Sequence, residues 1–330
     1  MKKIVIIIVS FLVLVSLGVG AVMLGAPYDN PVELGTAAIN VPEELSAIDK
    51  QIKVVSFNIR CFAKEENEEN NWNNRIDDIV AFFEDEKPDL IGFQELKHPQ
   101  YKFLIDYLGD EYGFYGIYRS GFNLKIGDYL IKDTQPDPTI FNLLRTSMIG
   151  EASAIFYKKS RFELIEADTF WYSKTPERPS KDWNSNFKRI GTHVRLKDHY
   201  TDNTFSFINT HLDNKSEKAR LESVKIIIDK IAALDEGVIL AGDFNFQEDN
   251  PGYSSLINGG LTDTRYASEI TSTEITSNSY SNTEQGKIID YIFLTDPHFN
   301  ALIFDVVTDT ASGKDFISDH YPLVSIIEYA

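Results

Sequence analysis

The sequence predicts a layered α/β (α+β) sandwich, and three observations support this fold class. Short apolar or alternating segments outnumber amphipathic ones along residues 51–330, so strands should outnumber helices. The helical segments fall between groups of strands, which favours a layered sandwich over a barrel of repeated strand–helix units. The chain has 330 residues, of which 43% are hydrophobic and 25% charged, so it can bury a sizeable core.

The first 26 residues are predicted to be a signal anchor or a signal peptide. Lys2 and Lys3 precede an apolar run over residues 4–26 that only Ser and Gly interrupt. A run of about 20 apolar residues can span a bilayer. Pro27 is unfavourable next to a cleavage site, so we expect an uncleaved anchor, with a secreted, cleaved form as the alternative. The positive flank places the N-terminus in the cytoplasm and the remainder outside the cell membrane.

Residues 27–50 are predicted to be a linker, and residues 51–330 one catalytic domain. Its first half should begin with buried strands at 53–59 and 89–94. Between them, apolar residues at helical spacing predict a helix over 73–86. The further expected elements up to residue 170 are a helix at 99–108, a strand at 112–119, and strands at 152–157 and 162–170 paired as a hairpin.

The second half begins with two strands, at 192–196 and 204–209, joined by a turn at Asp202-Asn203. The clearest helix follows at 216–234, and a short apolar strand at 238–241 comes directly after it. Residues 120–150, 171–188 and 251–285 are expected to be loops or turns. The last three strands are predicted at 288–294, 302–307 and 323–327.

The charge and cysteine content exclude some kinds of site. The net charge is −18, from 32 basic and 50 acidic residues, so a broad basic surface for nucleic acid is excluded. A polyanionic substrate stays compatible with this charge, because a bound metal and a few local cations can reverse the field at a site. Cys61 is the single cysteine, so neither an intrachain disulfide nor a cysteine-based zinc site can form.

Polar side chains recur where apolar strands end, and such strand ends are common places for sites. Asp243 and Asn245, in Gly242-Asp243-Phe244-Asn245, stand side by side at a strand end, although a plain turn would use the same residues. The other strand-end residues are Asn58, Glu95, His211, Asp290, Asp319 and His320. An oxygen-rich set of this kind suits Mg²⁺ or Mn²⁺ better than zinc.

Six of these segments resemble the endonuclease/exonuclease/phosphatase superfamily, which includes deoxyribonuclease I, exonuclease III and neutral sphingomyelinase. The matching motifs, in the family's order, are Ser56-Phe57-Asn58, Gln94-Glu95, Asn209-Thr210-His211, Gly242-Asp243-Phe244-Asn245, Ile289-Asp290-Tyr291 and Ser318-Asp319-His320. The resemblance covers roughly residues 52–330. It implies a deoxyribonuclease I-like, four-layer sandwich of two mixed β-sheets flanked by helices, and a bacterial, membrane-anchored or exported branch.

The resemblance also implies a metal centre and a water-activating group. Glu95 would be the principal ligand of Mg²⁺ or Mn²⁺, with Asn58 and Asp319 completing or orienting that shell. Asp243 would orient or deprotonate the attacking water, and Asn245 would hydrogen-bond a phosphoryl oxygen.

Two imidazoles complete the implied catalytic set. His320 would face the scissile phosphate while Asp290 holds its other ring nitrogen. His211 would be a second phosphate-facing imidazole, with Glu151 as its partner. Whether His320 or Asp243 takes the proton stays open.

Three further residues are candidates for substrate binding, namely Arg60, Arg189 and Asn214. Arg60 stands where the abasic-site repair branch has an acidic residue, so it could touch phosphate. The DNA-inserting loops of the nuclease members have no recognisable counterpart in residues 120–150 or 171–188.

We therefore expect a metal-dependent hydrolase of phosphodiesters or phosphomonoesters, acting by in-line attack of water on phosphorus. Its substrate would be a nucleic acid, a phospholipid head group or a small phosphate ester. The alternatives are a sphingomyelinase-like lipid phosphodiesterase, an extracellular nuclease, or a non-catalytic binding module of the same fold. We expect a monomer that meets the membrane through its N-terminal segment.

Overall fold

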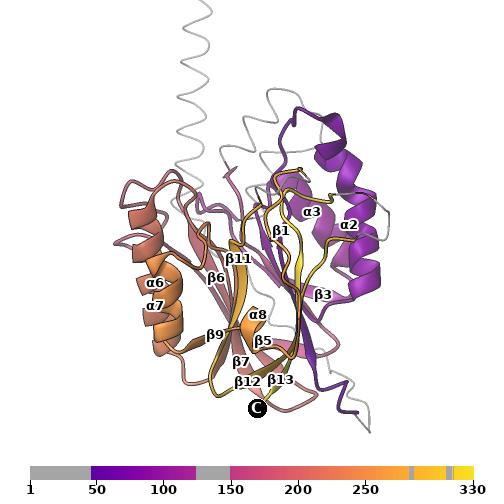
Figure 1. The fold of residues 1–330 in the computed structure, drawn as a ribbon, viewed down its shortest axis with the longest axis vertical. Coiled ribbons are helices and arrows are strands. Elements are labelled where there is room, and N and C mark those ends of the chain that lie inside the picture. The colour runs from indigo at the N-terminus through magenta and orange to yellow at the C-terminus, as the bar shows by residue number, and fades with distance from the viewer. Residues whose placement is uncertain (1–45, 124–148, 282–285, 310–313, 315) are drawn as a thin grey trace, which may run out of the picture.

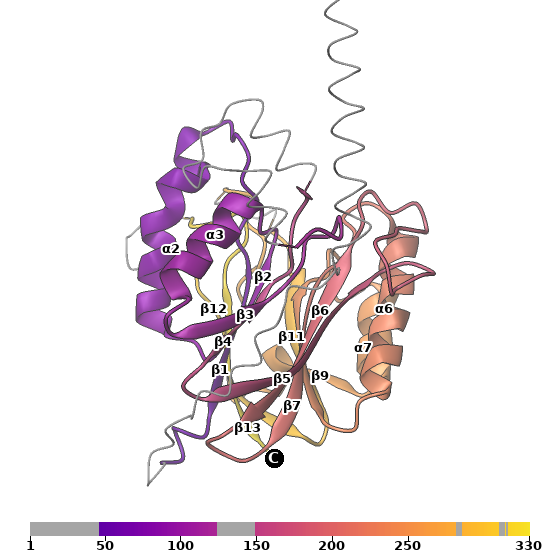
Figure 2. The same cartoon turned by 180° about the vertical axis from the view of Figure 1, so that it is seen from behind.

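Two mixed β-sheets pack face to face with helices on both outer sides, as Figures 1 and 2 show in opposite views. The structure is a computed structural model that describes residues 46–123, 149–281, 286–309, 314 and 316–330. The predicted layered sandwich is therefore confirmed. The predicted anchor at 1–26, most of the linker and most of the loop at 120–150 lie outside the described residues. Within the described residues, no helix is long and apolar enough to cross a membrane.

The first sheet has seven strands and carries the N-terminal helices on its outer face (Figure 2). Its helices are α2 (Trp72–Glu86) and α3 (His98–Leu108), and a 3-10 turn, η1 (Glu68–Asn70), precedes α2. In spatial order its strands are β10 (Ile270–Thr271), β12 (Phe299–Val306), β13 (Leu323–Tyr329), β1 (Ile52–Asn58), β2 (Leu90–Gln94), β4 (Ile155–Lys158) and β3 (Tyr112–Tyr115).

The second sheet has six strands, and α6 (Glu217–Ala232) and α7 (Pro251–Asn258) cover its outer face (Figure 1). In spatial order its strands are β5 (Phe162–Trp171), β6 (Ile190–Asp198), β7 (Thr204–His211), β8 (Gly237–Asp243), β11 (Asp290–Thr295) and β9 (Leu261–Asp263). A short helix, α8 (Thr264–Ala267), follows β9.

Three apolar clusters hold the layers together. The central cluster lies between the sheets and includes Val54, Phe207 and Ile292. One outer cluster packs α2 and α3 against the seven-stranded sheet, and another packs α6 and α7 against the six-stranded sheet. Central strands such as β1 and β8 are covered on both faces, so they are buried along nearly their whole length.

Two expectations about local structure were wrong. The predicted hairpin of residues 152–157 and 162–170 does not form, because β4 pairs with β2 and β3 while β5 pairs with β6 in the other sheet. The chain crosses between sheets at this point, which a local turn signal does not reveal. Residues 251–285, expected to be turns, contain α7, β9, α8 and β10.

Candidate active site

Pairing within each sheet brings the predicted strand-end residues to one end of the sandwich. β1 and β2 are parallel, with Asn58 opposite Gln94, so Asn58 and Glu95 leave the sheet at the same edge. β7 and β8 are also parallel, with His211 opposite Asp243, and the antiparallel β11 begins with Asp290 opposite Asp243. Hydrogen bonds from side chains of one sheet to side chains of the other close the cluster.

His320 and Asp290 form a buried imidazole–carboxylate pair. His320 Nδ1 lies 2.8 Å from Asp290 Oδ2, and the Thr276 hydroxyl donates to the same oxygen at 2.6 Å. Burial opposes a charge on the ring, but the charges of Asp290 and Asp243 and the hydrogen bond to Asp290 hold the pKa of His320 well above its usual range. The surroundings of His320 therefore favour its protonated form, and its second nitrogen, Nε2, lies 4.0 Å from Asp243 Oδ2.

Asp243 lies at the centre of the cluster. Its Oδ2 is 3.0 Å from Asn58 Nδ2, 3.3 Å from His211 Nε2 and 4.0 Å from His320 Nε2. Its Oδ1 accepts a hydrogen bond from the Asn245 backbone N–H at 2.9 Å. Burial, together with the charge of Asp290, raises the pKa of Asp243 to about 7. A carboxylate with a pKa near neutrality can accept a proton from water.

His211 has the opposite electrostatic character from His320. Burial, and then the positive charges of Arg189 and Arg119, hold the pKa of His211 well below its usual range. The site therefore places two imidazoles, with pKa values shifted in opposite directions, beside a shared carboxylate.

Backbone conformation at the strand ends is strained in a way that aims these side chains. Arg60, Glu95 and Asn245 are non-glycine residues with φ of 56°, 65° and 54°, in the left-handed region. Such positions cost of order 1–3 kcal/mol each and often cluster at functional sites. Gly242, just before Asp243, has φ of +149°, and a Cβ there would lie 2.0 Å from the Thr210 carbonyl oxygen.

Glu95, Asn58 and Asp319 lie beside Asp243 on the seven-stranded sheet's side of the site. Glu95 accepts a hydrogen bond from the Cys61 N–H at 2.9 Å, and its other oxygen lies 3.4 Å from Asn58 Nδ2. Burial would raise the pKa of Glu95, but the Cys61 hydrogen bond and the Arg60 charge hold it below its ordinary value. Burial and the charge of Glu95 raise the pKa of Asp319.

The donor chemistry of this region fits a hard divalent cation. Asn58 Nδ2 bridges the carboxylates of Glu95 and Asp243, so positive charge is already favoured between them. Asp290 Oδ1 is buried and has no hydrogen-bond partner within the described part of the chain. Ligand atoms of Asp243, Asp290 and His320 lie within 4.8 Å of one another, which makes a metal ion possible there as well. Oxygen-rich surroundings favour Mg²⁺ or Mn²⁺ over zinc.

The structure places the predicted substrate-binding residues in different surroundings. Arg60 is bound by Glu65 at 2.8 Å and by Asp319 at 3.2 Å, so carboxylates already neutralise it. Asn214 is exposed on the turn after β7. Its neighbour Asp213 is buried and accepts hydrogen bonds from Ser185, Asn186, Lys215 and Ser216.

Glu151 does not partner His211 as expected. It accepts from Arg119 Nη1 at 2.6 Å and lies 4.0 Å from Arg189 Nη1, whereas His211 contacts Asp243. Arg189, a predicted substrate-binding residue, is buried beside Glu151.

The sequence interpretation did not assign two residues that support the site. Arg75 on α2 donates to the backbone carbonyls of Ile59 and Ile317, which lie close to Asn58 and His320 in the chain. Thr276 orients Asp290. Arg75 gives some signal, because it places a charge on the apolar face of α2. Thr276 gives none.

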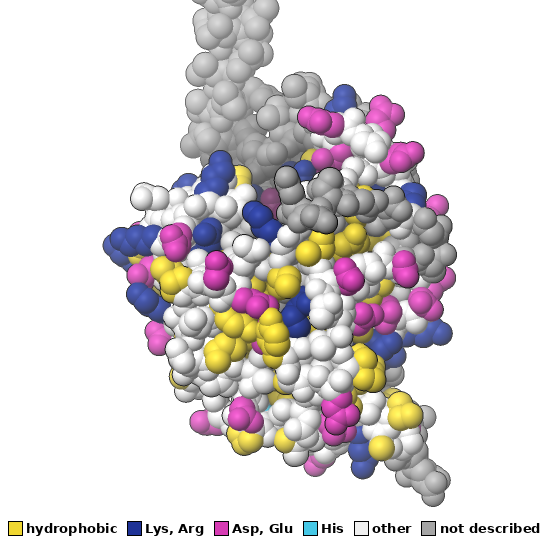
Figure 3. Space-filling model, viewed as in Figure 1, with side chains coloured by type: hydrophobic (Ala, Val, Ile, Leu, Met, Phe, Trp, Pro, Cys, Tyr) yellow, Lys and Arg dark blue, Asp and Glu magenta, His cyan; other side chains and the backbone are white. Residues whose placement is uncertain are grey.

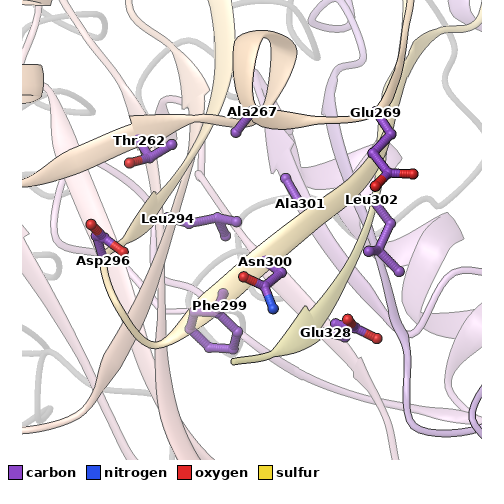
Figure 4. Close-up of a pocket in the computed structure, with 10 residues that line it drawn as sticks. All are labelled: Thr262, Ala267, Glu269, Leu294, Asp296, Phe299, Asn300, Ala301, Leu302 and Glu328. Atoms are coloured by element: carbon purple, nitrogen blue, oxygen red, sulfur yellow. The ribbon is translucent and has the colours of Figure 1, made fainter.

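A pocket of about 510 Å³ opens at the opposite end of the sandwich, where β11 ends and β12 begins (Figure 4). Its described lining includes Glu269, Asp296 and Glu328 and none of the site residues above. The chemistry is therefore concentrated at the other end of the strands.

Two mixed sheets face to face, with a buried Asp/Asp/His cluster at one end, define the class of deoxyribonuclease I-like phosphoesterase folds. Residues 55–320 match the Endonuclease/Exonuclease/phosphatase family, and the chain belongs to that family.

Similar structures extend over nearly the whole of each related chain. An endonuclease/exonuclease/phosphatase from Bacteroides vulgatus is 26% identical with a TM-score of 0.71, covering 85% of this chain and 99% of that one. A mannosyl-6-phosphatase from Bacteroides thetaiotaomicron is 27% identical with a TM-score of 0.69, covering 84% and 99%. Among curated proteins, an uncharacterized protein of Acanthamoeba polyphaga mimivirus is 25% identical over 290 residues, 84% of this chain and 100% of that protein.

Proposed function

We propose that this protein is a divalent-metal-dependent phosphoesterase that hydrolyses a phosphate ester by in-line attack of water. One observation carries the proposal: a single buried carboxylate, Asp243, lies 3.3 Å from His211 Nε2 and 4.0 Å from His320 Nε2, and Asp290 holds the other nitrogen of His320 at 2.8 Å. Such a set can take a proton from water on one side and neutralise a phosphoryl oxygen on the other.

Each residue has a defined part in the proposed reaction. Asp243 accepts the proton of the attacking water as the new P–O bond forms and the bond to the leaving oxygen breaks. His320, held by Asp290, donates from Nε2 to the phosphoryl group or the leaving oxygen. His211 and Asn245 donate hydrogen bonds to phosphoryl oxygens. Glu95, Asn58 and Asp319 would hold a Mg²⁺ or Mn²⁺ ion, which supplies charge stabilisation for the developing oxyanion.

A small phosphate ester is the substrate class that we favour. The similar structure named a mannosyl-6-phosphatase is covered over 99% of its length. The net charge of −18 opposes a long polyanion. On the face in Figure 3, Lys and Arg side chains are scattered among Asp and Glu rather than gathered into one basic surface. A nuclease or a sphingomyelinase-like lipid phosphodiesterase is the alternative.

The proposed location is outside the cytoplasm, with a monomeric catalytic domain tethered to the cell membrane. The motivation is the apolar run over residues 4–26 after Lys2 and Lys3. Fractionation of cells that express the full chain, with protease added from outside, tests this location. Protection of the catalytic domain in intact cells would contradict it.

A substrate panel tests the activity. Phosphate release from mannose 6-phosphate and p-nitrophenyl phosphate, and hydrolysis of bis-p-nitrophenyl phosphate, plasmid DNA, RNA and sphingomyelin vesicles, are measured with Mg²⁺, with Mn²⁺ and with EDTA. We expect metal-dependent turnover of a phosphomonoester, which His320→Ala and Asp243→Asn abolish. The matched control is His298→Ala, an exposed histidine near the opposite end of the strands. A folded protein that hydrolyses nothing on the panel would support a non-catalytic binding module instead.

A further inference from the structure

Two arginines gather at the end of the site that is furthest from His320. Along the six-stranded sheet the site residues follow the strand order: Asp290 begins β11, Asp243 ends β8, His211 ends β7, and Arg189 immediately precedes β6. Neighbouring strands are about 4.8 Å apart, so Arg189 lies about 10 Å from Asp243 along the sheet. The proposed chemistry uses neither this residue nor its neighbour Arg119.

Arg189 is a buried guanidinium whose donors are poorly used. Its side chain is 5% exposed, and its Nε has no hydrogen-bond partner within the described part of the chain. The carboxylates of Glu151 and Asp213 approach its nitrogens to 4.0 and 3.9 Å, which is beyond hydrogen-bond range. A buried charge without hydrogen bonds is costly and calls for an explanation.

Two other buried arginines in this chain make several side-chain hydrogen bonds each. Arg75, buried on α2, donates to four backbone carbonyls at 2.7–3.2 Å. Arg161, 3% exposed, donates to Asp198 from both Nε and Nη2 and to two backbone carbonyls. Within the described part of the chain, Arg189 has the two longer ion pairs and no side-chain hydrogen bond of this kind, so holding the fold together does not account for it.

The groups around Arg189 hold its position, and none of those that the structure describes accepts a hydrogen bond from its guanidinium. Arg119 pairs with Glu151 at 2.6 Å, and its guanidinium stacks over the Phe187 ring at 4.3 Å. The Arg189 guanidinium lies 5.7 Å from the same ring. The ring is 43% exposed, so it borders the arginines on the solvent side.

The charge of Arg189 also reaches into the site. It is the largest cause, apart from burial, of the lowered pKa of His211. It is also one of the charges that lower the pKa of Glu95. Its position just before β6, next to the strand that ends at His211, places this charge at the same end of the sheet as the site residues.

We propose that Arg189, supported by Arg119, Glu151 and Phe187, is a subsite for a second phosphate group of the substrate. This inference rests on the proposed function, since it places the second phosphate relative to the hydrolysed one. A planar guanidinium with unused donors suits bidentate binding of a phosphate. The substrate class is then a small ester with two phosphates, separated by a linker that spans about two strands.

Binding to metal-free full-length protein tests the subsite without turnover. Linear alkanediol bisphosphates with two to six carbons are titrated by calorimetry in EDTA, each beside the alkyl monophosphate of equal length. We expect the longer bisphosphates to bind about ten-fold more tightly than their monophosphates. Arg189→Gln should remove this advantage, so that each bisphosphate and its monophosphate bind the variant with affinities within about two-fold of each other.

Control variants separate the subsite from general charge and folding effects. Arg178→Gln removes an exposed arginine from the same 173–188 loop and should leave the advantage intact, as its side chain is 66% exposed. Phe187→Ala removes an exposed ring and should reduce the advantage even if Arg189→Gln fails to fold. Equal affinities of wild type for both ligand types, or an equal loss in Arg178→Gln, would overturn the subsite.

The two proposals fail in different ways. A bisphosphate advantage, with no hydrolysis on the substrate panel and no phosphate release from the alkanediol bisphosphates in Mg²⁺ or Mn²⁺, refutes the phosphoesterase and leaves the subsite standing. Hydrolysis without a bisphosphate advantage refutes the subsite alone.

Discussion

Replacing Arg75 by Met should destabilise the protein by about 3 kcal/mol, and the structure shows why. The Arg75 side chain is 1% exposed and donates to the carbonyls of Asn70, Arg60, Ile59 and Ile317 at 2.9, 3.2, 2.9 and 2.7 Å. These bonds connect α2 to both segments that lead into the site.

Only two of those four carbonyls should lose their partner altogether. The Arg60 carbonyl keeps a hydrogen bond from Gln100 at 2.8 Å, and Asn70 is partly exposed to water. The Ile59 and Ile317 carbonyls belong to fully buried residues and would be left unpaired. Each unpaired carbonyl costs about 1–3 kcal/mol, and relief from burying the charge offsets part of the sum.

Guanidinium denaturation and thermal melting measure the loss. We expect a decrease of about 6–12 °C in melting temperature, because a domain of this size shifts by roughly 2–4 °C per kcal/mol. Arg75→Lys should lose nearly as much, since one ammonium cannot reach carbonyls in separate directions. Arg178→Met, at an exposed arginine, is the control. A loss below about 1 kcal/mol in Arg75→Met would refute the conclusion that these hydrogen bonds of Arg75 stabilise the fold.

Three further predictions concern the site and the fold. Asp290→Asn should lower the rate constant of hydrolysis about 10²–10³-fold in a folded protein, because His320 loses its charged partner, and an unchanged rate would contradict this. Gly242→Ala should cost more than about 3 kcal/mol in urea denaturation, whereas Gly260→Ala, also at positive φ but with open space around it, should cost about 1 kcal/mol. Asp168→Asn should reduce stability at pH 7. Burial opposes its charge, but a buried histidine of β6 and a lysine of α6 lower the pKa of Asp168. A lowered pKa contributes stability that is fully present above the unfolded pKa of about 3.9 and is lost as the pH falls through the lower folded pKa, so the difference between variant and wild type should shrink steadily as the pH is lowered below about 3.9. A difference that does not shrink as the pH is lowered would contradict this account.

Much of the secondary structure could be predicted because its signals are local. Helical spacing located α2 and α6, and continuous apolar runs located β1, β2 and β8. Pairing could not be predicted in the same way. β4 and β5 are adjacent in sequence with a turn between them. However, β4 pairs with β2 and β3 in the seven-stranded sheet, whereas β5 pairs with β6 in the six-stranded sheet. The signal for α7 and β9 was hidden by the many turn-forming residues around them.

The site residues likewise divide into those with a local signal in the sequence and those without one. Asp290 could be picked out because a carboxylate that interrupts an apolar strand needs a partner, and the structure provides His320. The partner of Glu151 could not be predicted, because Arg119 lies 32 residues away in the chain. The burial of Asp213 beside the exposed Asn214 could not be predicted either, because it depends on Ser185 and Asn186 of the loop at residues 173–188, which has no periodic pattern.

The sequence by itself determined which residues stand at the ends of buried strands, since apolar runs and the polar residues that end them are local patterns. It therefore identified Asp243, His320, His211 and Glu95 as members of one site. Only the tertiary structure decided how they divide the work. Burial and neighbouring charges shift the pKa of His320 upward and that of His211 downward, and the packing of the loops brings Arg119 and Arg189 together around Glu151. These properties depend on contacts between residues far apart in the chain, because electrostatic fields act through space and not along the sequence.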